Sequence, residues 1–150
     1  LFPQYSVLKN VTLAPVLLKR MTEEEAEKKA RELIARVGLT DRINNYPCQL
    51  SGGQQQRVAI ARALALEPDI LCFDDPELTG EVLRVIKDLK STGSTMIVVT
   101  HEMEFARNVS DKVLFMADGV VEESGTPEEV FGTPQSDKTK SFLNKSLESV

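Results

Sequence analysis

The stretch Leu50-Ser51-Gly52-Gly53-Gln54-Gln55-Gln56-Arg57 predicts the first turns of a packed helix, and the other elements of the chain are placed around it. Ser51 is a favourable N-cap residue, and Gln54 three positions later completes the pattern of a capping box. The residues that follow, 58–66, are Val, Ala, Ile and Leu apart from Arg62. This composition is typical of a helix that is packed on most of its sides.

Two glycines at the start of this helix leave backbone N–H groups uncovered at its positive end. Gly52 and Gly53 carry no side chain that would shield these groups, and the Ser51 hydroxyl lies beside them in the sequence. Such a helix N-terminus can bind an anion, and phosphate suits it best. A well-capped helix that binds nothing has the same pattern, so the residues alone leave both interpretations open.

Composition excludes several classes of protein. The chain has 150 residues, of which 41% are hydrophobic and 27% charged, as in an ordinary globular domain. Its net charge is −5 and it has no dense block of Lys or Arg, which argues against a nucleic-acid partner. Cys48 and Cys72 lie in unrelated contexts, as expected for reduced thiols in a cytosolic protein. With a single histidine and no Cys-x-x-Cys pattern, a structural zinc site is not expected.

Apolar patterns and turn signals predict an α/β fold, with helices first and alternating strands and helices after them. Helices are expected at residues 7–15, 23–37, 52–66, 78–90, 102–109, 127–131 and 138–147, the first of them ending at a turn marked by Pro15. Strands are expected at residues 69–73, 95–100, 112–117 and 120–123, the last two joined by an Asp118-Gly119 hairpin turn. We expect a parallel sheet covered by helices, with the first two strands buried on both faces. The predicted domains are a helical part, residues 1–67, and an α/β part, residues 68–150.

Two polar residues directly follow the strands predicted to be buried. Asp74 comes at the carboxyl end of the first, where open α/β sheets bind their ligands, although many strands end in an aspartate that only caps the next helix. His101, the one histidine, follows the second strand, and a lone histidine is often a cap or a packed residue. Phe105 stands where a metalloprotease motif needs its second histidine, so that chemistry is excluded.

The segment LSGGQQQRVAIARAL, residues 50–64, resembles the signature motif of ABC-type ATPases. Residues 1–16 are similar to the segment after the Q-loop of that family, and residues 127–143 resemble its C-terminal end. The segments VTLAPV, THEMEFA and GTPEEVF are most similar to the subfamily that drives uptake of polar amino acids. The resemblance covers nearly the whole chain. It implies the C-terminal portion of a RecA-like P-loop NTPase parallel sheet, with an ABC-type helical subdomain.

The resemblance also implies roles for individual residues. It implies that four residues at the start of the signature helix contact the γ-phosphate of an ATP molecule held by a second subunit: Ser51, Gly52, Gly53 and Gln54. Asp74 would end a Walker B strand and hold Mg²⁺, usually through water, while His101 would reach the γ-phosphate as the switch histidine. The implied protein is the ATP-hydrolysing subunit of an ABC importer for polar amino acids. It would form a homodimer and bind transmembrane permease subunits, at the cytoplasmic inner face of the cell membrane.

The sequence departs from the family at its beginning. No G-x-x-x-x-G-K-[ST] pattern is present, so the Walker A loop that holds the phosphates is missing. The Q-loop glutamine would lie before Leu1, and Gln4 does not replace it. Both departures fit one explanation, that the first third to two-fifths of the domain is not in this sequence. The 150 residues are therefore not expected to hydrolyse ATP by themselves.

A further departure is FDDPEL, residues 73–78, which is about six residues shorter than the family pattern FDEPTSALDPEL. In one alignment the gap lies between Asp74 and Asp75, the catalytic glutamate is missing, and Asp75 is the D-loop aspartate. In the other, Asp75 fills the glutamate position and the gap follows Pro76. The first needs no substitution and is preferred; omitted residues would leave the Asp74–Asp75 peptide link broken. A natural tight turn with Asp75 as N-cap and Pro76 at the first helical position is the third possibility.

Two other functions compete with the importer subunit. One is a non-catalytic, truncated interaction module that docks on a permease or a dimer partner without turnover. The other is an ABC-type ATPase that acts on nucleic acid or ribosomes, and the acidic composition argues against it.

Overall fold

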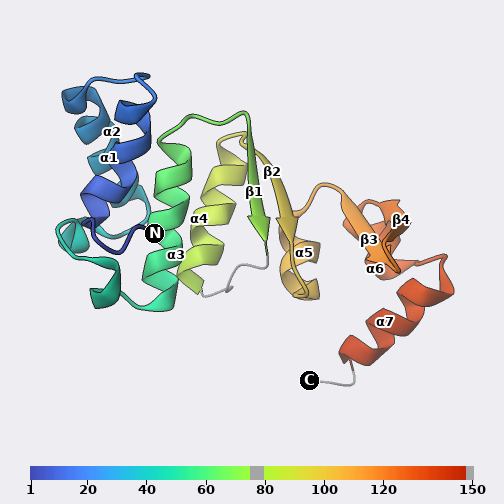
Figure 1. The fold of residues 1–150 in the computed structure, drawn as a ribbon. Helices are drawn as coiled ribbons and strands as arrows, with labels where there is room; N and C mark the ends of the chain where they lie inside the picture. Colours follow the sequence, from blue (N-terminus) through green and yellow to red (C-terminus); the bar gives the residue numbers. More distant parts are fainter. Residues whose placement is uncertain (75–79, 148–150) are drawn as a thin grey trace. The chain divides into compact units, whose positions relative to one another are not determined.

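The structure, a computed structural model, describes residues 1–74 and 80–147 (Figure 1). The chain forms two compact units, Leu1–Val99 and Thr100–Val150, and each is described here by itself. The predicted boundary near residue 67 lies within the first unit, so the division into a helical part and an α/β part stays a prediction. Among the helices of the described ranges, none is both long enough and apolar enough to cross a bilayer.

The first unit begins with helices that pack against one another (Figure 1). Its helices are α1 (Val7–Leu17), α2 (Glu23–Arg36), α3 (Gly52–Leu64) and α4 (Gly80–Ser91), with the short 3₁₀ turns η1 (Thr40–Arg42) and η2 (Pro47–Gln49). Ser51 caps α3 as predicted, and Ser6 and Thr22 likewise accept a hydrogen bond from the first turn of α1 and α2. Their shared core consists mainly of Val7, Val11, Ala30, Ile34, Val58 and Ala61.

Helix α1 is longer than predicted. It passes through Pro15 and ends at Leu17, so the expected stop at the proline is wrong. Pro15 lies in the last turn, where the N–H that it lacks removes one hydrogen bond and the helix ends soon afterwards. The Leu18 N–H still bonds to the Ala14 carbonyl at 3.0 Å, and the Arg20 N–H bonds to the Pro15 carbonyl at 3.0 Å. The chain beyond the proline is therefore still held.

Asn10 fixes the segment before α1. It is fully buried, and its side-chain nitrogen donates to the carbonyls of Phe2, Tyr5 and Ser6 at 3.1, 2.9 and 3.0 Å. The Phe2 N–H donates to the Asn10 side-chain oxygen at 2.8 Å. One buried amide thus bonds to four backbone groups, of which the Phe2 and Ser6 carbonyls also accept a backbone N–H. Residues 2–6 are in this way bound to the first helix.

Strands β1 (Ile70–Asp74) and β2 (Thr95–Val99) pair in parallel, with Asp74 opposite Val99. Their burial alternates: Leu71 is buried, whereas Ile70, Ile97 and Val99 are each more than half exposed. The prediction that both faces are buried is therefore wrong. A strand is covered twice only if elements pack on both sides of its sheet. In the described ranges, one face of this pair carries exposed apolar side chains.

Residues 100–147, the described part of the second unit, form a hairpin and three helices. Its elements are α5 (Met103–Val109), β3 (Val113–Ala117), β4 (Val120–Gly125), α6 (Pro127–Gly132) and α7 (Asp137–Leu147). The predicted hairpin is confirmed, since β3 and β4 are antiparallel and Asp118 and Gly119 have φ of 51° and 79°. Within the described residues β3 pairs with β4 alone, and its place as a third strand of the parallel sheet stays a prediction. A right-handed crossover does not require consecutive strands to be neighbours.

Candidate functional site

The start of α3 has the geometry that its sequence predicts. The Ser51 hydroxyl accepts the Gln54 N–H at 3.3 Å, and the Gln54 side-chain oxygen accepts the Ser51 N–H at 3.0 Å. Ser51 and Gly52 are exposed, and Gly53 is half-buried. Because the first N–H groups of a helix have no partner within it, those of Gly52 and Gly53 point out of the helix end. The positive end of the helix dipole adds to their attraction for an anion.

The loop before this helix end is held firmly. Leu50 is buried at 8% exposure, and its carbonyl accepts the Gln55 side-chain amide at 3.3 Å. The Tyr46 N–H, one turn earlier, donates to the Gln49 side-chain oxygen at 2.8 Å. These bonds fix the backbone on both sides of Ser51. An anion would therefore meet donors that are already oriented.

The sequence alone assigned no role to Arg57. A charged guanidinium within an otherwise apolar helix is nevertheless a signal of a structural or functional role. It is buried at 6% exposure on α3. Its Nη1 donates to the Val37 carbonyl at 2.8 Å, and its Nη2 lies 2.7 Å from a carboxylate oxygen of Glu81. The arginine thus joins α3 to the end of α2 and to the first turn of α4.

Asp74 is the last residue of β1 and is exposed at the carboxyl end of the strand pair. Among the residues that the structure describes, no group of three or more His, Cys, Asp or Glu could hold a metal ion. Mg²⁺ nevertheless binds through one or two carboxylates together with water and substrate phosphates. One exposed carboxylate at this position fits a water-mediated contact of that kind. Asp75, the two competing alignments and the expected break after Asp74 all lie outside the described residues.

His101 belongs to the second unit, two residues after the end of β2 and just before α5. Its side chain is 74% exposed, and its Nε2 lies 4.0 Å from a carboxylate oxygen of Glu102. The Glu102 N–H donates to the Thr100 hydroxyl at 3.1 Å, which orders the turn that carries the histidine. The imidazole is therefore presented to solvent and not packed. Ser51 and Asp74, by contrast, both belong to the first unit.

Two hollows in the first unit lie away from these candidate site residues. One, of about 180 Å³, is lined by α1 and α2 residues that include Lys9, Thr12 and Glu23. The other, of about 460 Å³, is lined by residues of α2, α3 and α4 that include Arg57 and Glu81. Neither is lined by residues 51–54 or by Asp74. The candidate phosphate site is thus an exposed helix end, and an enclosing surface would have to come from elsewhere.

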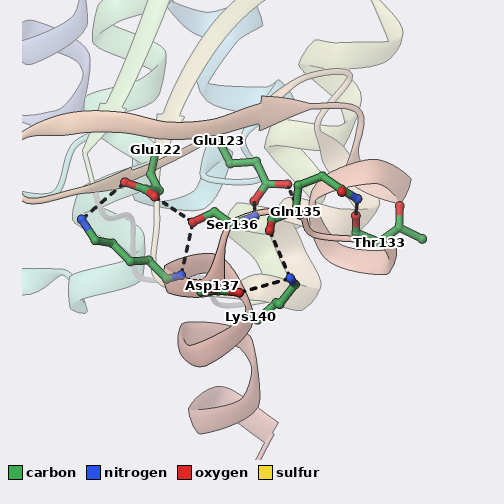
Figure 2. A network of polar contacts seen from close by, with 8 residues as sticks. Glu122, Glu123, Thr133, Gln135, Ser136, Asp137 and Lys140 are labelled. Atoms are coloured by element: carbon green, nitrogen blue, oxygen red, sulfur yellow. Dashed lines mark hydrogen bonds and ion pairs between the residues drawn. The ribbon is translucent and has the colours of Figure 1, made fainter.

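A polar cluster that the sequence did not predict holds the start of α7 to β4 (Figure 2). The Glu123 carboxylate accepts the N–H groups of Gln135 and Ser136 at 2.8 and 3.1 Å. The Ser136 hydroxyl donates to Glu122 at 2.8 Å. The buried Thr139 hydroxyl and the Gln135 N–H hold the pKa of Glu123 below its usual range. Since these groups are used within the fold, we assign the cluster a structural role.

Comparisons with known proteins agree with the resemblance in the sequence. A family model described as ABC transporter matches residues 1–78. The chain is 54% identical to the arginine transport ATP-binding protein ArgV of Corynebacterium glutamicum, over 98% of the chain and 60% of that protein. It is 51% identical to the L-cystine import ATP-binding protein TcyC of Bacillus subtilis, over 98% of the chain and 62% of that protein.

Solved structures give the same fold. The dimeric post-hydrolysis structure of the ATP-binding cassette MJ0796, bound to ADP and Pi, matches with a TM-score of 0.74 at 37% identity. That match covers 85% of this chain and 59% of the other. The ADP conformation of the cassette MJ1267 matches with a TM-score of 0.80 at 22% identity, over 95% and 63% of the two chains, which supports the fold alone. The α/β, RecA-like assignment is thus confirmed.

The chain spans about 60% of the length of the curated relatives it matches. The alignment to the arginine protein is 153 positions long, whereas 98% of this chain is about 147 residues. The relative therefore carries about six positions within the aligned region that this chain lacks. That difference equals the shortening predicted for residues 73–78.

Proposed function

The chain belongs to the ABC transporter family, and from that premise we propose that the protein which carries it is the ATP-hydrolysing subunit of an importer for polar amino acids. Relatives at 51–54% identity are named for transport of arginine, L-cystine and histidine, which supports this substrate class. These names differ from one another at similar identity, so the proposal covers the class and not one amino acid.

The observation that carries the proposal is the exposed start of α3. Its capping box fixes the Ser51 hydroxyl at the helix end, the N–H groups of Gly52 and Gly53 have no acceptor within the helix, and the exposed Gly52 leaves the approach open. We propose that Ser51, Gly52, Gly53 and Gln54 bind the γ-phosphate of ATP held by a second subunit. The relative MJ0796, 37% identical, has a structure described as dimeric and bound to ADP and Pi, which supports a site shared between two chains.

Each residue would contribute charge stabilisation or positioning and no covalent step. The N–H groups at the start of α3 would donate to the γ-phosphate oxygens. Asp74 would hold Mg²⁺ through water, and Mg²⁺ would neutralise phosphate charge as the bond to the leaving ADP breaks. His101, exposed on its turn, would contact the same phosphate and orient the attacking water. Asp75 would be the D-loop aspartate or would fill the glutamate position, as the two alignments allow.

The remaining partners follow from the family. We propose that a homodimer forms and that transmembrane permease subunits bind residues 1–47, at the cytoplasmic face of the membrane. The firmly held segment before α1 would suit this contact, because Asn10 ties residues 2–6 to a helix and lets them move with it. The net charge of −5 gives no support to a nucleic-acid partner.

The test uses the natural full-length polypeptide, reconstituted in vesicles with its permease. We expect uptake of a polar amino acid that requires ATP hydrolysis, and a loss of about 100-fold or more in hydrolysis rate for His101→Ala, the size expected when one phosphate contact is removed. Glu104→Gln, an exposed change on the following helix, is the control and should keep the wild-type rate. Binding to the permease without any ATP turnover would instead support the non-catalytic interaction module.

A further inference from the structure

Arg57 is a buried charge in a helix whose other buried residues are apolar. Val58, Ile60 and Ala61 are the remaining buried positions of α3. A buried guanidinium costs more to desolvate than an apolar side chain of similar volume, and it is rarely the most stable choice. In addition, its Nε is buried and has no hydrogen-bond partner. The side chain is therefore not explained by stability alone, and its contacts indicate what it is used for.

Those contacts link three helices. Nη1 donates to the carbonyl of Val37, the C-cap residue of α2, and Nη2 lies 2.7 Å from Glu81 in the first turn of α4. Gly38 lies close against the arginine, because a Cβ built at this glycine would come within 3.3 Å of Nη1. The guanidinium is thus held from one side by the α2 end and from the other by α4.

The Arg57–Glu81 ion pair joins the helix that begins with one part of the proposed site to the helix that follows the other part along the chain. Helix α3 begins with residues 51–54, which would bind the nucleotide of the partner subunit. Helix α4 begins six residues after Asp74, which would serve the nucleotide of the same subunit. Resting on the proposed function, we propose that Arg57 is a positioning residue that keeps these two half-sites in a fixed relation. Occupancy of one nucleotide site is then felt at the other through α3 and α4.

A second ion pair on α4 provides a matched control. Arg36 on α2 lies 2.6 Å from Asp88 and also donates to the Thr92 hydroxyl at 3.1 Å. The Arg36–Asp88 pair joins α2 to α4, whereas the Arg57–Glu81 pair joins α3 to α4. The control pair therefore does not involve α3. Asp88 is 48% exposed and Glu81 65%, so both carboxylates reach solvent, but the arginine facing Glu81 is buried whereas the arginine facing Asp88 is 33% exposed. Any effect specific to Glu81 must pass through Arg57.

The experiment compares Glu81→Gln with Asp88→Asn in the natural full-length polypeptide. A glutamine at position 81 still offers a side-chain oxygen to Arg57, so Glu81→Gln should fold, with a lower midpoint of thermal unfolding than Asp88→Asn because the buried guanidinium loses its counter-charge. For Glu81→Gln we expect kcat for ATP to fall about three- to tenfold while KM changes less than about twofold. We also expect the dependence of rate on ATP concentration to become less cooperative. Asp88→Asn should keep the wild-type kcat and cooperativity.

Each other outcome overturns the inference. If both variants lose activity equally, the pairs serve only to hold helices together. If Glu81→Gln changes KM alone, or changes neither constant, Arg57 does not relate the two half-sites. If the wild-type polypeptide binds its permease but does not hydrolyse ATP, the proposed function itself is wrong, and the positioning role is withdrawn with it.

Discussion

Replacing Ser51 by alanine separates a phosphate-binding role of the α3 start from its role in beginning a helix. The matched change is Thr22→Ala at the start of α2, because both residues form the same capping box. In each box the hydroxyl accepts a backbone N–H at 3.3 Å, from Gln54 in α3 and from Glu25 in α2. Both boxes are exposed and both open helices of similar length, 13 and 14 residues.

The stability cost should be similar for the two variants. Removing a serine or threonine N-cap costs about 1 kcal/mol, because one N–H of the first turn loses its protein acceptor. In a domain of this size, that loss lowers the midpoint of thermal unfolding by about 2–4 °C. Water reaches both helix starts and replaces part of the lost bond, so neither variant should fail to fold.

The rate of ATP hydrolysis should differ sharply between them. Ser51→Ala removes a donor aimed at the proposed phosphate position, and removal of one such group costs about 100-fold or more in kcat where the donor acts in the transition state. Thr22→Ala should stay within about twofold of the wild type, the change expected of a surface cap alone. The measurements are thermal unfolding and steady-state hydrolysis by the full-length polypeptide. Equal loss of hydrolysis in both variants would refute the reasoning, and so would a Ser51→Ala variant of wild-type rate.

Three further predictions concern the residues that shape each unit. Asn10→Ala should lower the free energy of unfolding by about 1–3 kcal/mol, because partly buried backbone groups at Phe2 and Tyr5 lose their side-chain partner, and denaturant unfolding measures this. Gly38→Ala should cost about 1–2 kcal/mol in the same assay, since its φ is +70° and the added methyl group crowds Arg57. The Thr139 hydroxyl and the Gln135 N–H lower the pKa of Glu123 in the folded protein. The ionised Glu123 therefore stabilises the fold fully at pH values above 4.5, the ordinary pKa of a glutamate. That effect is lost as the pH falls through the lower folded pKa, so amide exchange in α7 should accelerate there.

Matched variants check these three predictions. Asn108→Ala removes an exposed amide that bonds only to its own helix turn, and it should cost less than about 0.5 kcal/mol. Gly93→Ala has a similar φ of +79° with open space around it, so it measures the backbone cost without crowding. Glu123→Gln should remove the acid sensitivity of α7 exchange. An unchanged pH profile in that variant would show that another group titrates.

Local signals in the sequence predicted the local structure well. The Ser51–Gln54 capping box predicted the start of α3, and the Asp-Gly pair predicted the hairpin, because each depends on backbone groups a few residues away. The predictions that failed depended on distant elements. Burial of β1 and β2 was inferred from apolar composition, which does not say how many sides of a sheet are covered. Pro15 did not stop α1, because a proline removes one hydrogen bond and the residues after it still find acceptors, as the Leu18 N–H does at the Ala14 carbonyl.

The candidate site was predicted less completely than the fold. Ser51 and Gln54 form their predicted hydrogen bonds, and Asp74 ends its strand as expected. The sequence could not show that Arg57 reaches Glu81, 24 positions away, because nothing in the local pattern records that contact. The roles proposed for Asp74 and His101 stay predictions.

The uncovered face of the β1–β2 pair has a practical consequence for handling the protein. Ile70, Ile97 and Val99 would make the 150 residues prone to self-association when produced alone, because apolar strands with open edges associate with one another. The Cys72 thiol is exposed in the same strand and gives a chemical reporter for this surface. Rapid reaction with a maleimide in the isolated chain, and slow reaction in the full-length polypeptide, would show that the longer protein covers this face.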